Sequence, residues 1–294
     1  MPKENISDRN GRALEYKIID FLCGSRSSFK AALTSRAKAD QQRDRKKFLS
    51  LPEKLKESYE KTVSIVHDWL TKIINGKDIE IDRLSDDEAK KGDVTDIRIT
   101  EKGREVNLSI KHNHSALKHQ RPPTTVLWCG YTKRCQEDLE FRKKYKEVVE
   151  SFLSETRKAL PKASLFRELS AIGEGHIKDK FYFPVCSLVA KTIKELCSSP
   201  KRTEALFNFL VGKAIFYKII DENDRVRILD FTNVEIPKKV NVKPRDKSYV
   251  DLYFSNGWKV GMRLHTASSR LGTSLKFDTQ AISLPNVKEI IIKK

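Results

Sequence analysis

Two carboxylates and a lysine stand at the ends of two short segments in which polar and apolar residues alternate. Asp93 and Asp96 open the first segment, and Lys111 closes the second. The dipeptide Lys102-Gly103 between them indicates a tight turn, so we expect an antiparallel hairpin that brings Asp96 beside Lys111. Carboxylate oxygens bind Mg²⁺, and a neighbouring lysine can orient or deprotonate water and offset charge on a phosphate. The pattern therefore predicts hydrolysis of a phosphodiester.

This arrangement resembles the active site of the PD-(D/E)xK nuclease superfamily, in which an acid opens one strand and a D/E-x-K triplet lies on the next. The triplet here reads Ser109-Ile110-Lys111, so a serine stands where that pattern has its second acid. The resemblance implies that another element supplies the missing carboxylate. Glu15, on the first predicted helix, is the preferred candidate because several members of the superfamily place an acid on a preceding helix. Glu137 and Glu140 are weaker candidates.

The two aspartates compete for the role of the first acid in this pattern. Asp96 is favoured as the principal metal ligand because it leads directly into the alternating strand. Asp93 follows a glycine that would allow close approach, and is expected to be a second ligand or a supporting group. Asp93, Asp96, Lys111 and Glu15 are therefore the candidate catalytic residues, with Mg²⁺ as the expected cofactor. The spacing also fits two surface aspartates beside an ordinary strand, and that alternative stays open.

A run of hydrogen-bond donors follows Lys111. Imidazole, guanidinium, ammonium and amide groups can all donate to phosphate oxygens or to base edges, so this run predicts contacts with DNA. Zinc held by His112 and His114 is an alternative, although no cysteine or acid stands at a fitting local spacing. An HNH nuclease motif fits poorly because its residues are spread over a ββα unit, and a plain solvated loop is a further alternative. The candidate DNA-binding residues in this run are His112, Asn113, His114, Lys118, His119 and Arg121.

A second cluster of donors lies later in the chain, with small side chains between the donors. Arginine bound to O6 and N7 of guanine is the commonest specific base contact, so Arg263 and Arg270 are the expected guanine readers. The alternative is that these arginines contact phosphates or acidic neighbours. Trp258 and Phe277 are expected in the core, since both lie in alternating segments. The candidate DNA-binding residues here are Arg263, His265, Ser268, Ser269, Arg270 and Lys276.

Three stretches together resemble a narrower group, the HaeIII-type restriction endonuclease family. They are Asn10–Tyr16, Ser109–Pro122, and Phe254–Asp278 with its Arg-x-His-x-Ala-Ser-Ser-Arg run, and the similarity covers nearly the whole chain. The resemblance implies a type II restriction endonuclease that cleaves double-stranded DNA at the palindrome GGCC with Mg²⁺. It also implies a cognate DNA methyltransferase in the same system. Cleavage within a palindrome needs two active sites, which suggests a homodimer, although monomers acting in sequence would also serve.

The charge balance points to a polyanionic partner. The chain has 294 residues, with 58 Lys and Arg against 40 Asp and Glu, and a formal net charge of +18. Such an excess favours nucleic acid over an acidic protein partner or a surface that serves solubility. No apolar run is long enough to span a membrane, and the first residues lack the apolar core of a signal peptide, so a cytoplasmic protein is expected. Five cysteines without a C-x-x-C spacing disfavour a disulfide framework.

The elements that must position these residues predict a mixed α/β (α+β) fold. We expect a restriction-endonuclease-like core, with a mixed central sheet flanked by helices, and a β-rich C-terminal region. Residues 1–160 are expected to form the nuclease core, and residues 161–294 a helical and then β-rich DNA-recognition region packed with the core as one unit. Residues 25–50 are expected to form a basic connector with weak helical character, and residues 115–120 to begin a helix. The expected helices are 12–23, 52–74, 136–160 and 185–220, and the expected strands are 79–84, 96–100, 106–110, 225–231, 248–254, 258–265 and 287–292.

Other classes of function are compatible with this chain. A non-catalytic DNA-binding protein with a degenerate nuclease fold would account for Ser109 in the place of an acid. A structure-specific or repair nuclease would use the same metal chemistry. An RNA-processing nuclease is the least favoured class, because the chain lacks the aromatic-rich sheet motifs that stack unpaired bases.

Overall fold

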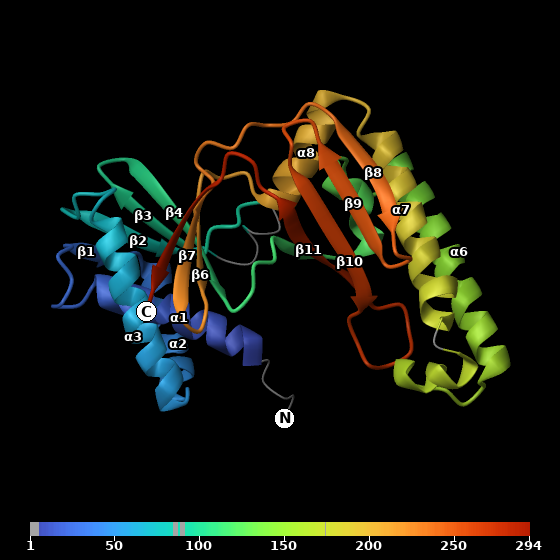
Figure 1. Ribbon diagram of the computed structural model, residues 1–294, viewed down its shortest axis with the longest axis horizontal. Helices are drawn as coiled ribbons and strands as arrows, with labels where there is room; N and C mark the ends of the chain where they lie inside the picture. Colours follow the sequence, from blue (N-terminus) through green and yellow to red (C-terminus); the bar gives the residue numbers. More distant parts are fainter. Residues whose placement is uncertain (1–5, 85–87, 89–91, 174) are drawn as a thin grey trace. The chain divides into compact units, whose positions relative to one another are not determined.

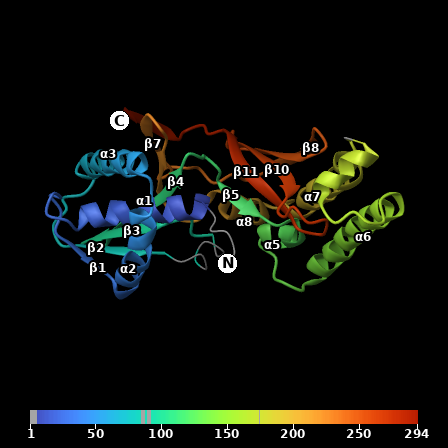
Figure 2. The ribbon, with the colours of Figure 1, turned by 90° about the horizontal axis from the view of Figure 1, so that it is seen from below.

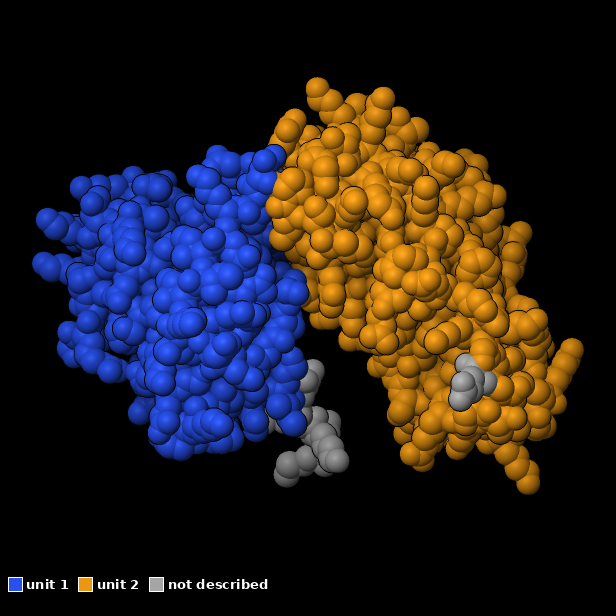
Figure 3. All heavy atoms as spheres, in the orientation of Figure 1, with its two compact units in different colours: residues 1–115, 212–234, 286–294 blue, residues 116–211, 235–285 orange. Residues whose placement is uncertain are grey.

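The computed structural model describes residues 6–84, 88, 92–173 and 175–294. Residues 1–5, which entered the signal-peptide prediction, lie outside this part of the chain. The chain groups into two compact units (Figure 3). The predicted boundary near residue 160 falls within unit 2. The assignment of a nuclease core to residues 1–160 and of a DNA-recognition region to residues 161–294 stays a prediction. Unit 1 comprises residues 1–115, 212–234 and 286–294, and unit 2 comprises residues 116–211 and 235–285.

Unit 1 is built on a seven-stranded mixed sheet with the strand order β1-β2-β3-β4-β6-β7-β12. β1 is parallel to β2 and β4 is parallel to β6, while every other neighbouring pair is antiparallel. The predicted hairpin is confirmed, because β3 pairs with β4 and the turn lies at Lys102 and Gly103, both with positive φ. The strands are β1 (Ala31–Leu33), β2 (Ile79–Arg83), β3 (Ile97–Glu101), β4 (Arg104–His112), β6 (Tyr217–Asp221), β7 (Arg225–Asp230) and β12 (Lys288–Lys293).

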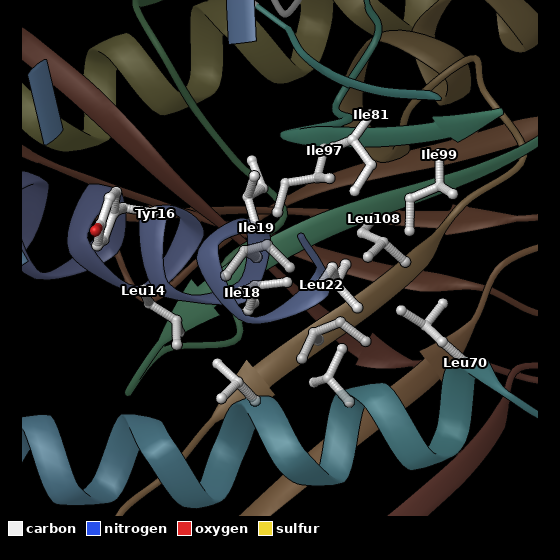
Figure 4. Packing of buried hydrophobic residues seen from close by; sticks show 14 of the residues in the cluster. Leu14, Tyr16, Ile18, Ile19, Leu22, Leu70, Ile81, Ile97, Ile99 and Leu108 are labelled. Carbon is white, nitrogen blue, oxygen red and sulfur yellow. The ribbon is translucent and has the colours of Figure 1, made fainter. Parts of the chain in front are cut away.

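Three helices lie beside this sheet: α1 (Ile6–Leu22), α2 (Ser35–Leu49) and α3 (Glu53–Leu70) (Figures 1 and 2). The core of unit 1 forms where the apolar sides of α1 and α3 meet one face of the sheet. Ile19 of α1 and Ile97 and Ile99 of β3 are completely buried there, as Figure 4 shows. Alternation in β3 places these isoleucines on the helix-covered face. The polar residues between them therefore lie on the opposite face.

Unit 2 contains a five-stranded antiparallel sheet with the order β5-β11-β10-β9-β8. Helix α7 contacts β8 and β9, and α6 packs on α7 (Figure 1). Trp258 and Phe277 are 1% and 0% exposed, which confirms their predicted place in the core. The strands are β5 (Lys118–Gln120), β8 (Val240–Arg245), β9 (Tyr249–Phe254), β10 (Lys259–Thr266) and β11 (Leu275–Ser283). The helices are α5 (Thr125–Trp128), α6 (Gln136–Ala159), α7 (Phe183–Leu196) and α8 (Pro200–Val211), with helical turns at Pro122–Thr124, Phe166–Ile172 and Lys178–Tyr182.

The predicted fold class is confirmed. A mixed sheet flanked by helices forms one unit, and an antiparallel sheet dominates the later part of the other. Among the helices in the described residues, none is both long enough and apolar enough to cross a membrane.

The predicted basic connector is a regular helix, so that prediction is wrong for α2. Thr34 caps the helix, and its side chain accepts a hydrogen bond from the backbone N–H of Ala37. Phe48 near the other end packs its ring against that of Tyr16 in α1. Capping and this tertiary contact stabilise a helix whose composition is too polar to show a clear apolar face.

Two segments predicted as helical are strands. The helix expected to reach residue 220 ends at Val211, and residues 217–221 form β6 between β4 and β7. The segment expected to begin a helix contains β5 (Lys118–Gln120), which pairs with β11. A short apolar run fits a buried strand as well as a helix, and only the pairing partner distinguishes them.

Truncation of Ile99 tests the importance of the unit 1 core. Ile99→Ala removes a completely buried side chain from a central strand, and should lower the free energy of unfolding by about 2–5 kcal/mol. Urea denaturation measures this change. Ile291→Ala is the matched control, because Ile291 lies on β12 of the same sheet and is 54% exposed. Equal losses in the two variants would contradict this placement of the core.

Candidate active site

Asp96 and Lys111 meet at the β3–β4 hairpin. The backbone N–H of Asp96, the residue before β3, donates to the carbonyl of Leu108 at 2.8 Å. Its carboxylate Oδ2 accepts from Lys111 Nζ at 3.1 Å and from the backbone N–H of Ile110 at 2.6 Å. The Asp96 and Lys111 side chains are 26% and 23% exposed. The hairpin therefore presents a carboxylate and an ammonium group side by side, both open to a ligand.

Ser109 supports Asp96 and does not replace the missing acid. Its hydroxyl lies 3.3 Å from Asp96 Oδ2 and donates to it, and the residue is 2% exposed. A serine in this position adds a third hydrogen bond to the Asp96 carboxylate. It adds no negative charge, so a second carboxylate must come from another element.

Glu15 of α1 is the second carboxylate beside Asp96. Its side chain is 14% exposed and forms an ion pair with Arg83. Burial and the negative charge of Asp96 raise the pKa of Glu15 to about 7, against the opposing charges of Arg83, Lys111 and Arg12. Because α1 packs on β4 and the charges of Asp96 and Lys111 both act on Glu15, we place Glu15 near the end of the hairpin.

Arg83 holds Glu15 in place, although it is not among the residues predicted from the sequence. It lies at the end of β2, where its Nη1 is 2.8 Å from Oδ2 of Asp44 in α2. The Arg83 and Asp44 side chains are 2% and 0% exposed. Burial opposes ionisation of Asp44, but hydrogen bonds and charge from Arg43 and Arg83 lower its pKa. The sequence signal was a charged residue at an apolar position of the alternating strand Ile79–Arg83.

Asp93 faces a different partner. Its Oδ2 accepts from Arg98 Nη2 at 2.8 Å, and its Oδ1 accepts from the backbone N–H of Thr95 at 3.0 Å. Arg98 also donates to Asn107 on β4 at 2.8 Å. Asp93 thus stabilises the chain that leads into β3, and the structure shows it bound to Arg98 instead of Lys111. The weaker candidates Glu137 and Glu140 lie on α6 of unit 2.

Glu15 and Asp96 could hold a divalent cation. Among the described residues, no group of three or more His, Cys, Asp or Glu side chains is arranged to hold a metal. Mg²⁺ is commonly bound by one or two carboxylates, with waters and substrate phosphate as its other ligands. Two neighbouring carboxylates with a raised pKa on Glu15 fit that donor set, because a cation would relieve their repulsion.

The first two residues after Lys111 are held by hydrogen bonds, whereas residues 114–117 form a loop before β5. His112 Nδ1 lies 2.7 Å from Oδ2 of Asp221, which is 1% exposed and also accepts from Thr62 and Lys294. Burial opposes ionisation of Asp221, but the hydrogen bonds from His112, Lys294 and Thr62 lower its pKa. The Asn113 amide contacts His112 Nε2, and its backbone N–H donates to the Asp221 carbonyl. These contacts orient both side chains next to Lys111.

Lys218 is a buried lysine near the Asp96–Lys111 pair. It lies on β6 directly opposite Ser109, is 3% exposed, and donates to the carbonyl of Ser115 at 3.0 Å. Burial and the charge of Lys111 lower its pKa to about 7, although Asp96 acts in the opposite direction. A buried amine with a strongly shifted pKa is typical of functional sites. Lys218 could not be recognised from the sequence, because its short apolar segment fits a helix as well as a strand.

The candidate DNA-binding residues of unit 2 divide between two places. Four of them share the exposed face of the five-stranded sheet: His119 on β5, Arg263 and His265 on β10, and Lys276 on β11. Lys118 points to the opposite face, where its Nζ lies 3.7 Å from the ring centroid of Phe209.

The remaining candidates lie at loops. Arg121 follows β5 and donates to the side chain of Ser274 and the carbonyl of Leu275. Ser268, Ser269 and Arg270 lie in the connection between β10 and β11, where the backbone N–H of Arg270 donates to the Ser268 hydroxyl. Ser269 and Arg270 are exposed. His114 is also exposed, in the segment after β4.

Glu15→Gln tests the electrostatic cost of the second carboxylate. The pKa of Glu15 in the folded state, about 7, lies above its ordinary value of 4.5. Stability linked to this group is therefore full below about pH 4.5 and is lost as the pH rises through 7. Glutamine cannot ionise, so the variant does not lose this stability as the pH rises. Its free energy of unfolding should exceed that of the wild type by about 1–3 kcal/mol at pH 8, and by less than about 1 kcal/mol at pH 5. Urea denaturation with a chelator present measures both values.

Exposed Glu57 on α3 provides the control for this comparison. Glu57→Gln should change the free energy of unfolding by about 0.5 kcal/mol or less at either pH. If the free energies of unfolding of Glu15→Gln and the wild type differed by the same amount at pH 5 and pH 8, the raised pKa of Glu15 would be contradicted.

Lys218→Met tests whether a buried charge is retained at the expense of stability. The pKa of Lys218 is lowered from 10.5 to about 7, so stability linked to this group is present above pH 10.5 and is lost as the pH falls through 7. The variant should therefore be more stable than the wild type by about 1–3 kcal/mol at pH 6, with a smaller advantage at pH 9. Lys61→Met, at an exposed site on α3, should show no such pH trend in the same urea titrations.

Comparison with known proteins identifies the family. A sequence profile of the HaeIII restriction endonuclease family matches residues 11–241 and 225–285. The type II restriction enzyme HaeIII of Haemophilus aegyptius is 25% identical to this chain over 325 aligned positions, which cover 96% of each protein. No solved structure matches the chain. The resemblance seen in the three sequence stretches is confirmed, and the chain belongs to the HaeIII restriction endonuclease family.

Proposed function

We propose that this type II restriction endonuclease hydrolyses phosphodiester bonds in double-stranded DNA with Mg²⁺ held by Glu15 and Asp96. The observation that carries the proposal is the contact of 3.1 Å between Lys111 Nζ and Asp96 Oδ2, with Glu15 as a second carboxylate beside them. Carboxylates next to a lysine are the groups that metal-assisted hydrolysis of a phosphodiester requires.

Each residue of the active site has a distinct role in this proposal. Mg²⁺ bound to the two carboxylates would supply positive charge to the phosphodiester. Lys111 orients the attacking water and offsets the charge that develops on the phosphate oxygens. Ser109 and the backbone N–H of Ile110 hold the Asp96 carboxylate in position. Asp93 acts as a supporting group through Arg98 rather than as a metal ligand.

We further propose that the enzyme recognises GGCC. The HaeIII-type resemblance carries this site, and the match to HaeIII over 96% of the chain supports it. Arg263 and Arg270 would contact guanine, and the other exposed donors of unit 2, with His112, Asn113 and His114 of unit 1, would contact bases or phosphates. The net charge of +18 supports the affinity for DNA that these contacts need.

The biological setting follows from the same proposal. A cytoplasmic restriction enzyme must spare the DNA of its own cell, so a cognate DNA methyltransferase is expected in the same system. Cleavage of both strands at a palindrome would be served by a homodimer that places one active site on each strand.

Lys111→Ala tests the catalytic assignment. Loss of the ammonium group beside Asp96 should reduce plasmid cleavage in Mg²⁺ by about 10²–10⁴-fold, while site-specific binding measured in Ca²⁺ remains. Lys61→Ala, at an exposed site on α3, is the matched control and should cleave as the wild type does. Full cleavage by Lys111→Ala would refute the assignment.

The wild-type digestion separates this proposal from its alternatives. Discrete fragments whose sequenced ends share GGCC would support the proposed specificity. Discrete fragments that share another sequence would contradict only the GGCC site and leave the proposed cleavage chemistry intact. Random nicking would indicate a structure-specific or repair nuclease. Specific binding without cleavage in Mg²⁺ would indicate a non-catalytic DNA-binding protein, the alternative that Ser109 in the place of an acid raises.

A further inference from the structure

The Asp278 carboxylate lies among donors on the exposed face of the unit 2 sheet. Asp278 on β11 is 2.5 Å from Nδ1 of His119 through Oδ1, and 2.8 Å from Nε2 of His265 through Oδ2. Lys276 Nζ lies 3.6 Å from the same Oδ1. Arg263 is directly opposite Asp278 on the neighbouring strand. One carboxylate thus faces cationic or donor side chains from β5, β10 and β11.

The strand register explains why these groups converge. His119 on β5 and Arg263 on β10 are both paired with Asp278, and His265 is paired with Lys276. Directly paired residues of an antiparallel sheet share a face, and residues two apart on one strand also share it. The cluster is therefore a product of the sheet, and its members come from segments more than 140 positions apart in the sequence.

Asp278 is an anion within this cluster. Burial opposes its ionisation, but the close contact with His265 and the nearby charges of His119 and Lys276 lower its pKa. An anion on a surface that binds DNA repels phosphate and reduces affinity for every sequence. The position of Asp278 on this face is explained if the residue improves discrimination between DNA sequences and does not serve overall affinity for DNA.

We propose that Asp278 is a positioning residue for DNA sequence recognition, which holds His119 and Lys276 in the orientations that meet base edges. His265 Nδ1 lies 3.1 Å from the Thr266 carbonyl and its Nε2 2.8 Å from Asp278, so His265 helps to fix the carboxylate. This inference rests on the proposed function. Long or rotatable donors lose conformational freedom when they bind, and a fixed acceptor removes part of that cost in advance. Because base contacts depend on donor orientation far more than phosphate contacts do, the effect should fall on discrimination between sequences.

Asp278→Asn tests this role by fluorescence anisotropy in Ca²⁺, with one duplex that carries the cleaved sequence and one in which that sequence is scrambled. Removal of the negative charge should leave binding to the scrambled duplex unchanged or stronger. Binding to the specific duplex should weaken, so that the ratio of the two affinities falls by about 10-fold to 100-fold. An unchanged ratio would overturn the inference.

Asp246→Asn is the matched control for charge. Asp246 lies in the same unit with a 70% exposed side chain, and it pairs with Arg245 and with no member of the Asp278 cluster. Its replacement should strengthen binding to both duplexes by similar factors, and leave their ratio intact. The same fall in the ratio for Asp246→Asn would show that charge alone, and not position, sets the selectivity, and would overturn the proposal.

A double-mutant cycle with His119→Gln separates positioning from misfolding. If Asp278 acts through His119, Asp278→Asn should reduce the affinity ratio by a smaller factor in the His119→Gln background than in the wild type. If Asp278→Asn reduced the affinity ratio by the same factor in both backgrounds, the proposal would be overturned. It would also be overturned if the melting temperatures of the variants fell in proportion to their loss of selectivity. Wild-type protein that fails to distinguish the two duplexes would instead contradict the proposed function itself.

Discussion

The carboxylate of Asp96 connects the fold of unit 1 to its proposed chemistry. It accepts hydrogen bonds from the backbone of Ile110 and the side chains of Ser109 and Lys111, all on the neighbouring strand. The β3–β4 register must be correct for these bonds to form, because a slip of one residue would turn Lys111 to the other face. The completely buried isoleucines of β3 hold that register, since the same slip would expose them. Core packing and the position of the active groups thus depend on one alignment of two strands.

Several charged side chains lie buried around this carboxylate, although burial opposes their ionisation. Glu15 has a raised pKa and Lys218 a lowered pKa, both chiefly because of burial. Arg83 and Asp44 form a buried ion pair that holds Glu15 from the other side. Buried charges of this kind are weak sources of stability, and apolar residues of similar size would often stabilise a protein more. Their concentration around Asp96 and Lys111 is therefore better explained by function than by folding.

The two faces of the five-stranded sheet in unit 2 separate the core from the surface proposed to recognise DNA. Trp258 and Phe277 lie on the buried side, while Arg263 and Lys276 lie on the other. Alternation along β10 and β11 produces this division directly, because successive residues point to opposite faces. The same rule explains why Lys118 turns towards Phe209 while its neighbour His119 reaches Asp278. Being a donor in a basic run was not enough to place a residue on the exposed face.

The sequence by itself determined the features that depend on local pattern: the family, the fold class, the β3–β4 hairpin, and the meeting of Asp96 with Lys111. These follow from alternation, a turn and residue types close together in the chain. Only the tertiary structure decided the contributions of distant segments. It directed Asp93 to Arg98, placed β6 with Lys218 next to β4, and gathered the Asp278 cluster from three strands. Glu15 was named in advance by the superfamily resemblance, and the packing of α1 on β4 gives it a place near Asp96. Local patterns cannot supply these contacts, because strand pairing and helix packing between remote segments set them, and a short apolar run such as β6 fits a helix equally well until its partners are known.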